Sequence, residues 1–374
     1  MNNYFITGST GVVGSAVVSE LLAHDGAGLQ LLIRAKDQAD LACRLSEMLR
    51  FWEIRPDSDI AKRIRPLRGD ITLPRFGLTE EEYEHIARTS THIIHSAAIV
   101  KMTLPLEEAR HSAVTSVKSV LELANRCRER GVLQKVDIVS TVGVAGLTPG
   151  LIPEEPMLDV QKFHNTYEAS KSEAERHIFQ NQGDLPVTLH RPSMVVGNSV
   201  TGKIVHFQVF YHLCEFLSGQ HTRGLIPGTN GVFLDTIPVD YVARAIAHSS
   251  QHPNQTIGKI FHLCSGPRSS VPIPDLVNWV GDRFSRGDKV KIRAIPSSLF
   301  RRSLPVMFWF ASERARKALR NLPLFLDYLD FPQQFSNTRS GAFFEQVGIT
   351  LPKFPEYLPA VLDFYLKARP TRPS

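Results

Sequence analysis

The 374-residue sequence is poor in cysteine. Its four cysteines, Cys43, Cys127, Cys214 and Cys264, lie far apart and form no CxxC pair, so neither a zinc ribbon nor a disulfide framework is indicated. We expect the cysteines to be reduced and mainly structural, and we predict no metal site.

The sequence also lacks a segment that could enter or cross a membrane. Its strongest apolar runs, such as residues 304–311, fall far short of the roughly 20 residues that span a bilayer. Residues 1–5 have neither the basic nor the apolar region of a signal peptide, so a cytoplasmic location is the expectation.

The composition is that of a folded protein. Hydrophobic residues make up 43% and charged residues 21% of the chain, which excludes a disordered, collagen-like or coiled-coil protein. The formal net charge is +6 and the calculated pI is near 9.1, which favours an anionic partner without specifying phosphate, nucleic acid or lipid.

Short apolar runs alternate with longer amphipathic segments through the first half of the chain. This rhythm predicts strands at 4–6, 29–33, 64–67, 93–94, 136–139 and 187–189, and helices at 12–22, 40–51, 114–124 and 167–179. Alternating βα units of this kind form a doubly wound parallel sheet. The fold class is therefore predicted to be α/β.

The alternation weakens after about residue 191, and from about residue 283 the composition shifts toward arginine, phenylalanine, leucine and proline. Between residues 283 and 320, eleven basic residues stand against Asp288 and Glu313, interleaved with Phe300, Phe308 and Trp309. This basic stretch fits a surface that meets an anionic, partly apolar partner, although a solvated charged face is the alternative. We expect no nucleic-acid binding, because no recognised nucleic-acid motif accompanies it.

A glycine-rich turn follows the first predicted strand directly. Glycines spaced three apart at a strand-to-helix junction let the backbone approach a pyrophosphate, whose charge meets the free N–H groups of the helix. The residues expected to contact a dinucleotide here are Thr7, Gly8, Ser9, Thr10, Gly11, Val12, Val13 and Gly14.

The second predicted strand ends in Arg34, where an NAD-specific site would present a carboxylate to the ribose. A cation there suits a 2′-phosphate, so NADPH is the expected cofactor, and Lys36 and Arg44 could add to the clamp. Asp70, followed by Ile71, is placed to meet the adenine. Small residues after the fourth strand, Ser96, Ala97 and Ala98, allow close approach to the cofactor or simply tight packing.

A catalytic group is indicated between the fifth and sixth predicted strands. Tyr167 and Lys171 lie four residues apart on one helix face, where an ammonium can lower the pKa of a phenol and bond a nicotinamide ribose. Thr141, after Ser140 at the end of the preceding strand, supplies a hydroxyl at the carboxyl edge of the sheet. Such a group can stabilise or protonate an alkoxide formed by hydride transfer.

Together these motifs resemble the extended short-chain dehydrogenase/reductase superfamily, over nearly the whole chain. More narrowly, residues 32–35, 42–45, 69–71, 76–78, 95–98, 191–193, 235–240, 348–352 and 357–358 are similar to the thioester reductase and fatty acyl-CoA reductase (male-sterility-like) branch. The resemblance implies a Rossmann-type doubly wound sheet with a smaller, mainly helical C-terminal lobe. The expected NADP-binding domain is residues 1–200 with a returning segment near 232–265, and the expected substrate lobe is 201–231 with 266–374.

The resemblance further implies NADPH-dependent reduction of an acyl thioester, on coenzyme A or an acyl carrier protein, either to an aldehyde or further to an alcohol. Thr141 and Tyr167 would hold the oxyanion, Tyr167 would donate the proton and Lys171 would bind the ribose. Pro192, Ser193 and Met194 join the expected cofactor contacts. The aromatic residues of the basic stretch would line an acyl tunnel or touch a membrane surface.

Two positions depart from the family pattern. Ala113 stands where the family commonly has asparagine, and Lys101 replaces an asparagine after the fourth strand. Lys101 is a candidate ligand for the cofactor or a substrate anion, with a solvated loop lysine as the alternative. Other candidate functions are an alcohol or ketone oxidoreductase of the sterol or sugar-nucleotide type, and a non-catalytic NADP-binding sensor.

Overall fold

The computed structural model describes residues 2–23, 26–100, 102, 104–220, 222, 224–228, 231–284, 291–310, 326, 331 and 333–368. At its centre lies a parallel sheet of seven strands: β1 (Asn3–Thr7), β2 (Gly28–Ile33), β3 (Ile64–Arg68), β4 (His92–His95), β5 (Lys135–Val139), β7 (Val187–Pro192) and β12 (Ile260–Leu263). Their order is β12-β7-β5-β4-β1-β2-β3, and every neighbouring pair is parallel. The predicted doubly wound α/β sheet is confirmed.

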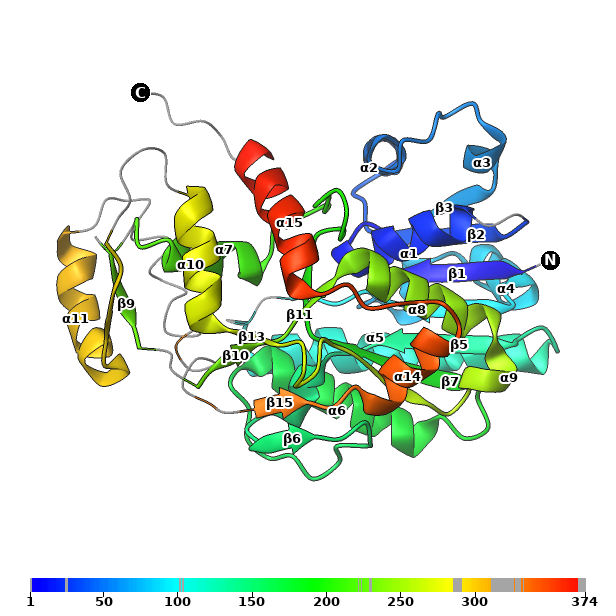
Figure 1. The fold of residues 1–374 in the computed structure, drawn as a ribbon. Helices are drawn as coiled ribbons and strands as arrows, with labels where there is room; N and C mark the ends of the chain where they lie inside the picture. The colour runs from blue at the N-terminus through cyan, green and yellow to red at the C-terminus, as the bar shows by residue number, and fades with distance from the viewer. Residues whose placement is uncertain are drawn as a thin grey trace.

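Helices cover both faces of this sheet (Figure 1). One face carries α1 (Val12–Ala23), α2 (Gln38–Phe51) and α8 (Val239–Gln251), whose apolar residues form one buried cluster with β1 and β2. The other carries α4 (Glu80–Thr89), α5 (Leu106–Glu129) and α6 (Thr166–Asn181) around a second cluster. Because the sheet is covered on both sides, its strands are mainly apolar, which is why they were recognisable as short apolar runs.

The strand order reverses beside β1. From there the chain runs outward through β2 and β3, then returns to place β4 and β5 on the other side. The crossovers diverge at this point, so a crevice opens beyond the carboxyl ends of β1 and β4, the place where ligands of open α/β sheets bind.

The remaining described elements lie outside the seven-stranded sheet. The helices are α3 (Asp59–Lys62), η1 (Pro74–Gly77), η2 (Val142–Ala145), α7 (Val209–Leu217), α9 (Pro253–Thr256), α10 (Ile273–Phe284), α11 (Ser297–Phe310), α14 (Thr338–Gln346) and α15 (Phe354–Ala368). The strand pairs are β8 (Met194–Val196) with β11 (Thr236–Pro238), β9 (Leu225–Pro227) with β14 (Arg293–Ile295), β10 (Phe233–Leu234) with β13 (Val271–Pro272), and β6 (Gly150–Ile152) with β15 (Gln333–Phe335).

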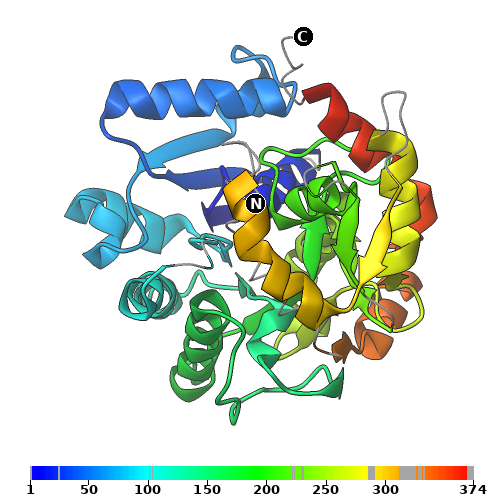
Figure 2. The ribbon, with the colours of Figure 1, turned by 90° about the vertical axis from the view of Figure 1, so that its left-hand side faces the viewer.

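Most of these elements gather beyond the carboxyl ends of the sheet strands, with α11 outermost (Figure 1). Figure 2 looks at the molecule from that side and shows α11 crossing in front of the sheet. Strand β15 lies near the end of the chain, yet it pairs with β6, which belongs to the connection between β5 and α6. This pairing brings a late segment of the chain against the segment that follows Thr141.

The predicted strands and helices all occur, with most ends shifted by at most three residues. The exception is α5, which begins eight residues before and ends five residues after the predicted helix at 114–124. Helix α4, between the third and fourth strands, is an addition; a capping box of Thr79 and Glu82 starts it. All four cysteines are described and none forms a disulfide. Within the described part of the chain, no helix has the length and apolar character needed to cross a membrane.

The basic stretch is described only in part. Of its eleven basic residues, Arg286, Lys289, Arg314, Arg316, Lys317 and Arg320 lie outside the described residues, as does Lys101. Arg283 forms an ion pair with Asp363 on α15, and Trp309 near the end of α11 is 80% exposed.

Candidate active site

The loop between β1 and α1 is shaped by two close backbone approaches. Gly8 has φ of +74°, and a Cβ atom there would lie 2.5 Å from the backbone nitrogen of Ala97. A Cβ at Gly14 would lie 2.1 Å from the carbonyl oxygen of Gly8. Only glycine fits either position, so the turn from strand into helix is as tight as a phosphate-binding loop requires.

A chain of buried hydrogen bonds holds the β4 loop against this turn. The Thr7 hydroxyl lies 2.8 Å from His95 Nδ1 and accepts from the backbone N–H of Ala97 at 3.3 Å. Ser116 Oγ on α5 lies 3.3 Å from His95 Nε2 and donates to the carbonyl of Ala113. Because the Ser116 hydroxyl donates to Ala113, it accepts from Nε2–H of His95. Burial lowers the pKa of His95 to about 3, so the ring is neutral and Nδ1 accepts from the Thr7 hydroxyl.

The residues around the turn fit the pyrophosphate of a dinucleotide. Helix α1 points its N-terminus at the loop and carries no acidic residue in its first turn, so its positive end is not neutralised by a nearby carboxylate. The Ser9 side chain is fully buried, and no described residue forms a hydrogen bond with its hydroxyl. The turn therefore offers N–H groups and a hydroxyl to a bound anion.

Four cations gather where β2 and β3 end. Arg34 and Lys36 are exposed after the end of β2, and the guanidinium of Arg44, in the second turn of α2, donates to the Arg34 carbonyl. Arg68, which sequence reasoning missed, ends β3 and donates to the carbonyl of Lys36 at 3.1 Å. The pairing of β2 with β3 places Arg68 beside Ile33, so this cation comes from a register that no local motif reveals.

Two carboxylates lie close to these cations, but both are engaged with the backbone. Asp37 caps α2 by accepting from the N–H of Asp40 at 2.8 Å, and Asp40 accepts from the N–H of Lys36 at 2.9 Å. They stabilise the start of α2, as N-terminal acids commonly do. The corner thus retains its arginines for an anion.

Asp70 and Ile71, the expected adenine contacts, lie after β3. Asp70 Oδ1 accepts from both the N–H and the hydroxyl of Thr72, at 2.9 and 2.8 Å, which makes a tight local turn. Ile71 packs against the cluster between the sheet and α5. The carboxylate therefore has a structural role in the turn, and only its Oδ2 atom is outside these two bonds.

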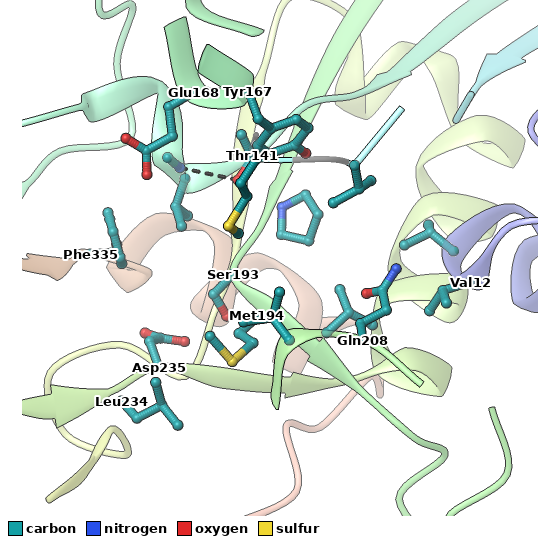
Figure 3. Close-up of a pocket in the computed structure, with 18 of the residues that line it drawn as sticks. Val12, Thr141, Tyr167, Glu168, Ser193, Met194, Gln208, Leu234, Asp235 and Phe335 are labelled. Atoms are coloured by element: carbon teal, nitrogen blue, oxygen red, sulfur yellow. Dashed lines mark hydrogen bonds between the residues drawn. The ribbon is translucent and has the colours of Figure 1, made fainter. Parts of the chain in front are cut away.

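A cavity of about 490 Å³ opens beyond the carboxyl ends of the strands (Figure 3). The expected site residues that line it are Gly11, Val12, Val13, Ser96, Ala98, Thr141, Tyr167, Pro192, Ser193 and Met194. Those that do not are Thr7, Gly8, Ser9, Thr10, Gly14, Arg34, Lys36, Arg44, Asp70, Ile71, Ala97 and Lys171. Ten of these 22 expected residues therefore line one cavity. The other twelve lie in the glycine loop, at the ends of β2 and β3, in the loop after β4, and on α2 and α6.

Thr141 and Tyr167 both line this cavity, and in Figure 3 they lie between Val12 on one side and Glu168 on the other. The Thr141 hydroxyl accepts from the N–H of Gly143 at 3.1 Å, which fixes its direction at the start of η2. Burial raises the pKa of Tyr167, and the charge of Glu168 adds to the effect. The phenol therefore keeps its proton at neutral pH, as a proton donor must.

Lys171 lies one helical turn beyond Tyr167 but does not line the cavity. It is buried, and its Nζ atom donates to the carbonyl of Val139, the last residue of β5, at 2.9 Å. Burial lowers the pKa of Lys171 to about 8, while the charge of Glu175 acts in the opposite direction. Among the described residues no hydrogen bond joins Lys171 to Tyr167, although the two residues lie one turn apart on α6.

The cavity has two distinct walls. We call Gly11, Val12, Val13, Ser96 and Ala98 the glycine-loop wall, and His164, Glu168, Leu234, Asp235, Gln333 and Phe335 the far wall. In Figure 3, Val12 lies on one side of Thr141 and Tyr167, while Glu168, Asp235 and Phe335 lie on the other. The sequence analysis named all five residues of the glycine-loop wall as site residues and no residue of the far wall.

Polar anchors fix the far wall. Asp235 accepts from the N–H groups of Ser265 and Gly266 at 2.8 and 3.0 Å, and burial raises its pKa. Gln333 donates to the carbonyls of Gly146 and Thr148 at 3.0 and 2.7 Å. One feature of the sequence pointed to this wall: residues 235–240, which include Asp235, form one of the segments that resemble the thioester reductase branch.

Another anchor lies just behind the far wall. Glu154 is buried and accepts from the N–H groups of Arg339 and Ser340, at 2.7 and 2.9 Å, and from the Ser340 hydroxyl. These are N–H groups of the first turn of α14, so a carboxylate from the β5–α6 connection caps a helix that is about 185 residues away in sequence. Glu154 thereby holds the start of α14, just after the segment with Gln333 and Phe335, against the connection between β5 and α6.

Comparisons with known proteins agree with this architecture. A family model described as "Male sterility protein" matches residues 6–246. An isonitrile lipopeptide synthase from Streptomyces coeruleorubidus is 29% identical over 279 residues, which cover 74% of this chain and 18% of the synthase. The chain spans less than a third of the length of the first curated relatives it matches.

Two solved structures extend the likeness to the whole chain. The terminal R domain from the myxalamid PKS-NRPS biosynthetic pathway has a TM-score of 0.83 and 27% identity, covering 98% of this chain and 91% of that one. A thiolation-reductase di-domain from an archaeal non-ribosomal peptide synthetase has a TM-score of 0.76 and 19% identity, covering 98% and 75%. The second likeness supports the fold, and the first extends to sequence.

Proposed function

Because the chain belongs to the male sterility protein family, within the extended short-chain dehydrogenases/reductases, we propose that it reduces an acyl thioester to an aldehyde with NADPH. The observation that carries the proposal is the cavity itself. It joins a phosphate-binding turn on one wall, a protonated tyrosine and an oriented threonine hydroxyl in the middle, and a largely apolar space beyond them. That arrangement suits a carbonyl between a hydride donor and a proton donor.

Each proposed catalytic residue has a defined role. A bound reduced nicotinamide would supply the hydride to the thioester carbon. Thr141 and Tyr167 hold the carbonyl oxygen, and Tyr167 gives its proton to the oxygen as negative charge develops. Lys171, anchored on Val139 and largely protonated at neutral pH, stabilises that charge through the low-dielectric interior and binds the ribose.

The remaining expected residues hold the cofactor. We propose that Thr7 to Gly14 and Ser96 to Ala98 enclose the pyrophosphate and nicotinamide ends, with Pro192, Ser193 and Met194 along the nicotinamide. Arg34, Lys36 and Arg44, joined by Arg68, bind the 2′-phosphate and so favour NADPH over NADH. Asp70 and Ile71 border the adenine.

We propose a carrier-protein thioester as the substrate, with coenzyme A as the other source of the same pantetheine thiol. The support is the reductase character of the neighbours, one of which is a thiolation-reductase di-domain. In this view residues 1–200 with 232–265 bind the cofactor, and residues 201–231 with 266–374 bind the substrate. The exposed Trp309 and the basic residues around it would then meet the acidic carrier.

The test follows three quantities in one reaction: NADPH oxidation, free thiol and aldehyde. The protein is mixed with a long-chain acyl-CoA, and separately with the same acyl group on an acyl carrier protein. Release of thiol in step with NADPH consumption is the expected result. NADPH binding without thiol release on either substrate would overturn the proposal and favour an alcohol or ketone oxidoreductase with the same Thr141, Tyr167 and Lys171.

A further inference from the structure

His164 and Glu168 form a buried acid–base pair in the far wall, and the tasks assigned to Thr141, Tyr167 and Lys171 leave this pair unused. His164 Nδ1 lies 3.1 Å from Glu168 Oε2, and the two side chains are only 4% and 3% exposed. Both residues line the cavity. A histidine whose ring nitrogen is held by a buried carboxylate is a common arrangement for a group that exchanges protons.

The hydrogen bonds decide which ring nitrogen can act. A carboxylate only accepts, so the Nδ1–H group of His164 donates to Glu168, and Nε2 is the nitrogen that can exchange a proton with a bound molecule. Glu168 Oε2 also accepts from the backbone N–H of His164 at 3.0 Å. The carboxylate therefore fixes both the ring and the main chain of the same residue.

The pair is also held from the side of the helix and the catalytic loop. Glu168 is in the first turn of α6, where its N–H donates to Asn165 Oδ1 at 3.0 Å. A Cβ at Gly143 would lie 3.0 Å from Glu168 Cγ, so Glu168 packs closely on the loop that orients Thr141. The Phe331 ring stands edge-on to the His164 ring at 5.5 Å between centroids.

The proposed reaction needs a second proton for which no residue has yet been named. Hydride addition and proton transfer from Tyr167 convert the thioester into a hemithioacetal, and the aldehyde forms only when the carbon–sulfur bond breaks. The leaving sulfur then carries the bond's electron pair as a thiolate. An alkyl thiol has a pKa of roughly 8.5, so a proton donor near the sulfur stabilises this departure.

We propose that His164 protonates the leaving sulfur and that Glu168 is its positioning residue; this inference rests on the proposed thioester reduction. As the carbon–sulfur bond breaks, the hemithioacetal oxygen reforms the carbonyl and returns its proton to the Tyr167 phenolate. The sulfur takes a proton from Nε2 of the His164 imidazolium. Solvent reprotonates the imidazole, so each turnover consumes one hydride and one proton and gives one aldehyde and one thiol.

The test varies the leaving thiol while the acyl group stays the same. One substrate is the thioester of N-acetylcysteamine, an alkyl thiol, and the other is the thioester of thiophenol, a more acidic thiol that departs without a proton donor. His164→Gln should slow thiol release from the alkyl thioester by about 100-fold and from the aryl thioester by less than about threefold. In a single turnover with the alkyl thioester, cofactor oxidation should precede thiol release in this variant, whereas the two coincide in the wild type.

Two further variants complete the design. Glu168→Gln keeps an acceptor for the backbone N–H of His164 but removes the charge, and should show the same leaving-group dependence with about a tenfold loss on the alkyl thioester. His111→Gln, at an exposed position on α5 outside the cavity, should match the wild type on both. Thermal unfolding checks each variant, and Glu168→Gln carries the test if His164→Gln does not fold.

The outcomes separate the two proposals. Equal slowing of both thioesters, or no slowing of either, would overturn the role of His164 while leaving thioester reduction intact. If the wild type releases thiol from neither substrate, the proposed function itself fails.

Discussion

The two walls of the cavity are built in different ways. The glycine-loop wall comes from two loops that directly follow neighbouring strands, and its shape depends on backbone contacts such as Gly8 against Ala97. The far wall comes from segments near residues 164, 235 and 333. Hydrogen bonds hold these segments in place: Gln333 donates to the backbone, and the carboxylates of Asp235 and the buried Glu154 accept from it. The glycine-loop wall thus continues directly from strands of the sheet, whereas the far wall depends on a few long-range hydrogen bonds. Substitutions in one wall should therefore affect cofactor binding, and substitutions in the other should affect substrate binding.

The largest expected effect lies between the walls. Tyr167→Phe removes the phenolic proton without changing the ring that lines the cavity, and should lower kcat about 1,000-fold, since a positioned proton donor contributes on the order of 100- to 10,000-fold. NADPH affinity, measured by fluorescence titration, should change less than about threefold. Turnover within a factor of ten of the wild type would remove Tyr167 from the chemistry.

Loss of the Glu154 carboxylate should break the far wall selectively. Glu154→Ala leaves the N–H groups of Arg339 and Ser340 without their acceptor and should reduce the free energy of unfolding by about 3 kcal/mol. The KM for the thioester should rise more than the Kd for NADPH. Urea unfolding and steady-state kinetics measure both.

Glu154→Gln is the matched control for this change. It keeps one carbonyl oxygen as an acceptor and should cost about 1 kcal/mol. Equal changes in thioester KM and NADPH Kd for the alanine variant would show that the two walls are not separable.

Burial of the Lys171 ammonium should lower the stability of the folded protein at neutral pH. Its folded pKa of about 8 lies below its ordinary value of 10.5, so the folded state disfavours the ammonium, and burial costs most below pH 8, where both states are charged. As the pH rises from 8 to 10.5, the folded protein loses the proton first and this cost disappears. Lys171→Met should therefore be inactive yet more stable at pH 7, by about 2 kcal/mol after loss of the hydrogen bond to Val139.

The measurement for Lys171→Met is urea unfolding at pH 7 and at pH 10. The advantage of the variant over the wild type should be clear at pH 7 and small at pH 10. A constant difference at the two pH values would contradict a buried ammonium.

The smallest expected effect concerns the exposed corner at the end of β2. Arg34→Ala should weaken NADPH binding by about tenfold and change NADH binding little, because only NADPH carries the 2′-phosphate. Arg68→Ala should act in the same direction and more weakly, since Arg68 also donates to the Lys36 carbonyl. Calorimetric titration with both cofactors measures the ratio; equal losses for NADPH and NADH would refute the phosphate clamp.

The sequence-based predictions succeeded where local pattern and structure coincide. Strands such as Leu29–Ile33 stand out because a strand buried on both faces is apolar throughout, and the helix with Tyr167 and Lys171 follows from its own periodicity. Tyr167 and Lys171 lie one helical turn apart, as the spacing predicts, and the Lys171 ammonium donates to a carbonyl at the end of β5. That choice depends on how α6 packs on the sheet, which i, i+4 spacing does not encode.

The sequence by itself determined the doubly wound sheet, the glycine turn and the identity of the residues between the walls, because each rests on periodicity or on neighbours within one turn of the chain. Only the tertiary structure decided which residues form the far wall, which carboxylate caps α14, and that Arg68 joins the cations of β2. Those assignments depend on strand register and on hydrogen bonds such as Gln333 to Thr148, which joins residues 185 apart. A long-range bond of this kind selects its partners through the packing of whole elements, so neither segment carries a local signature of the other.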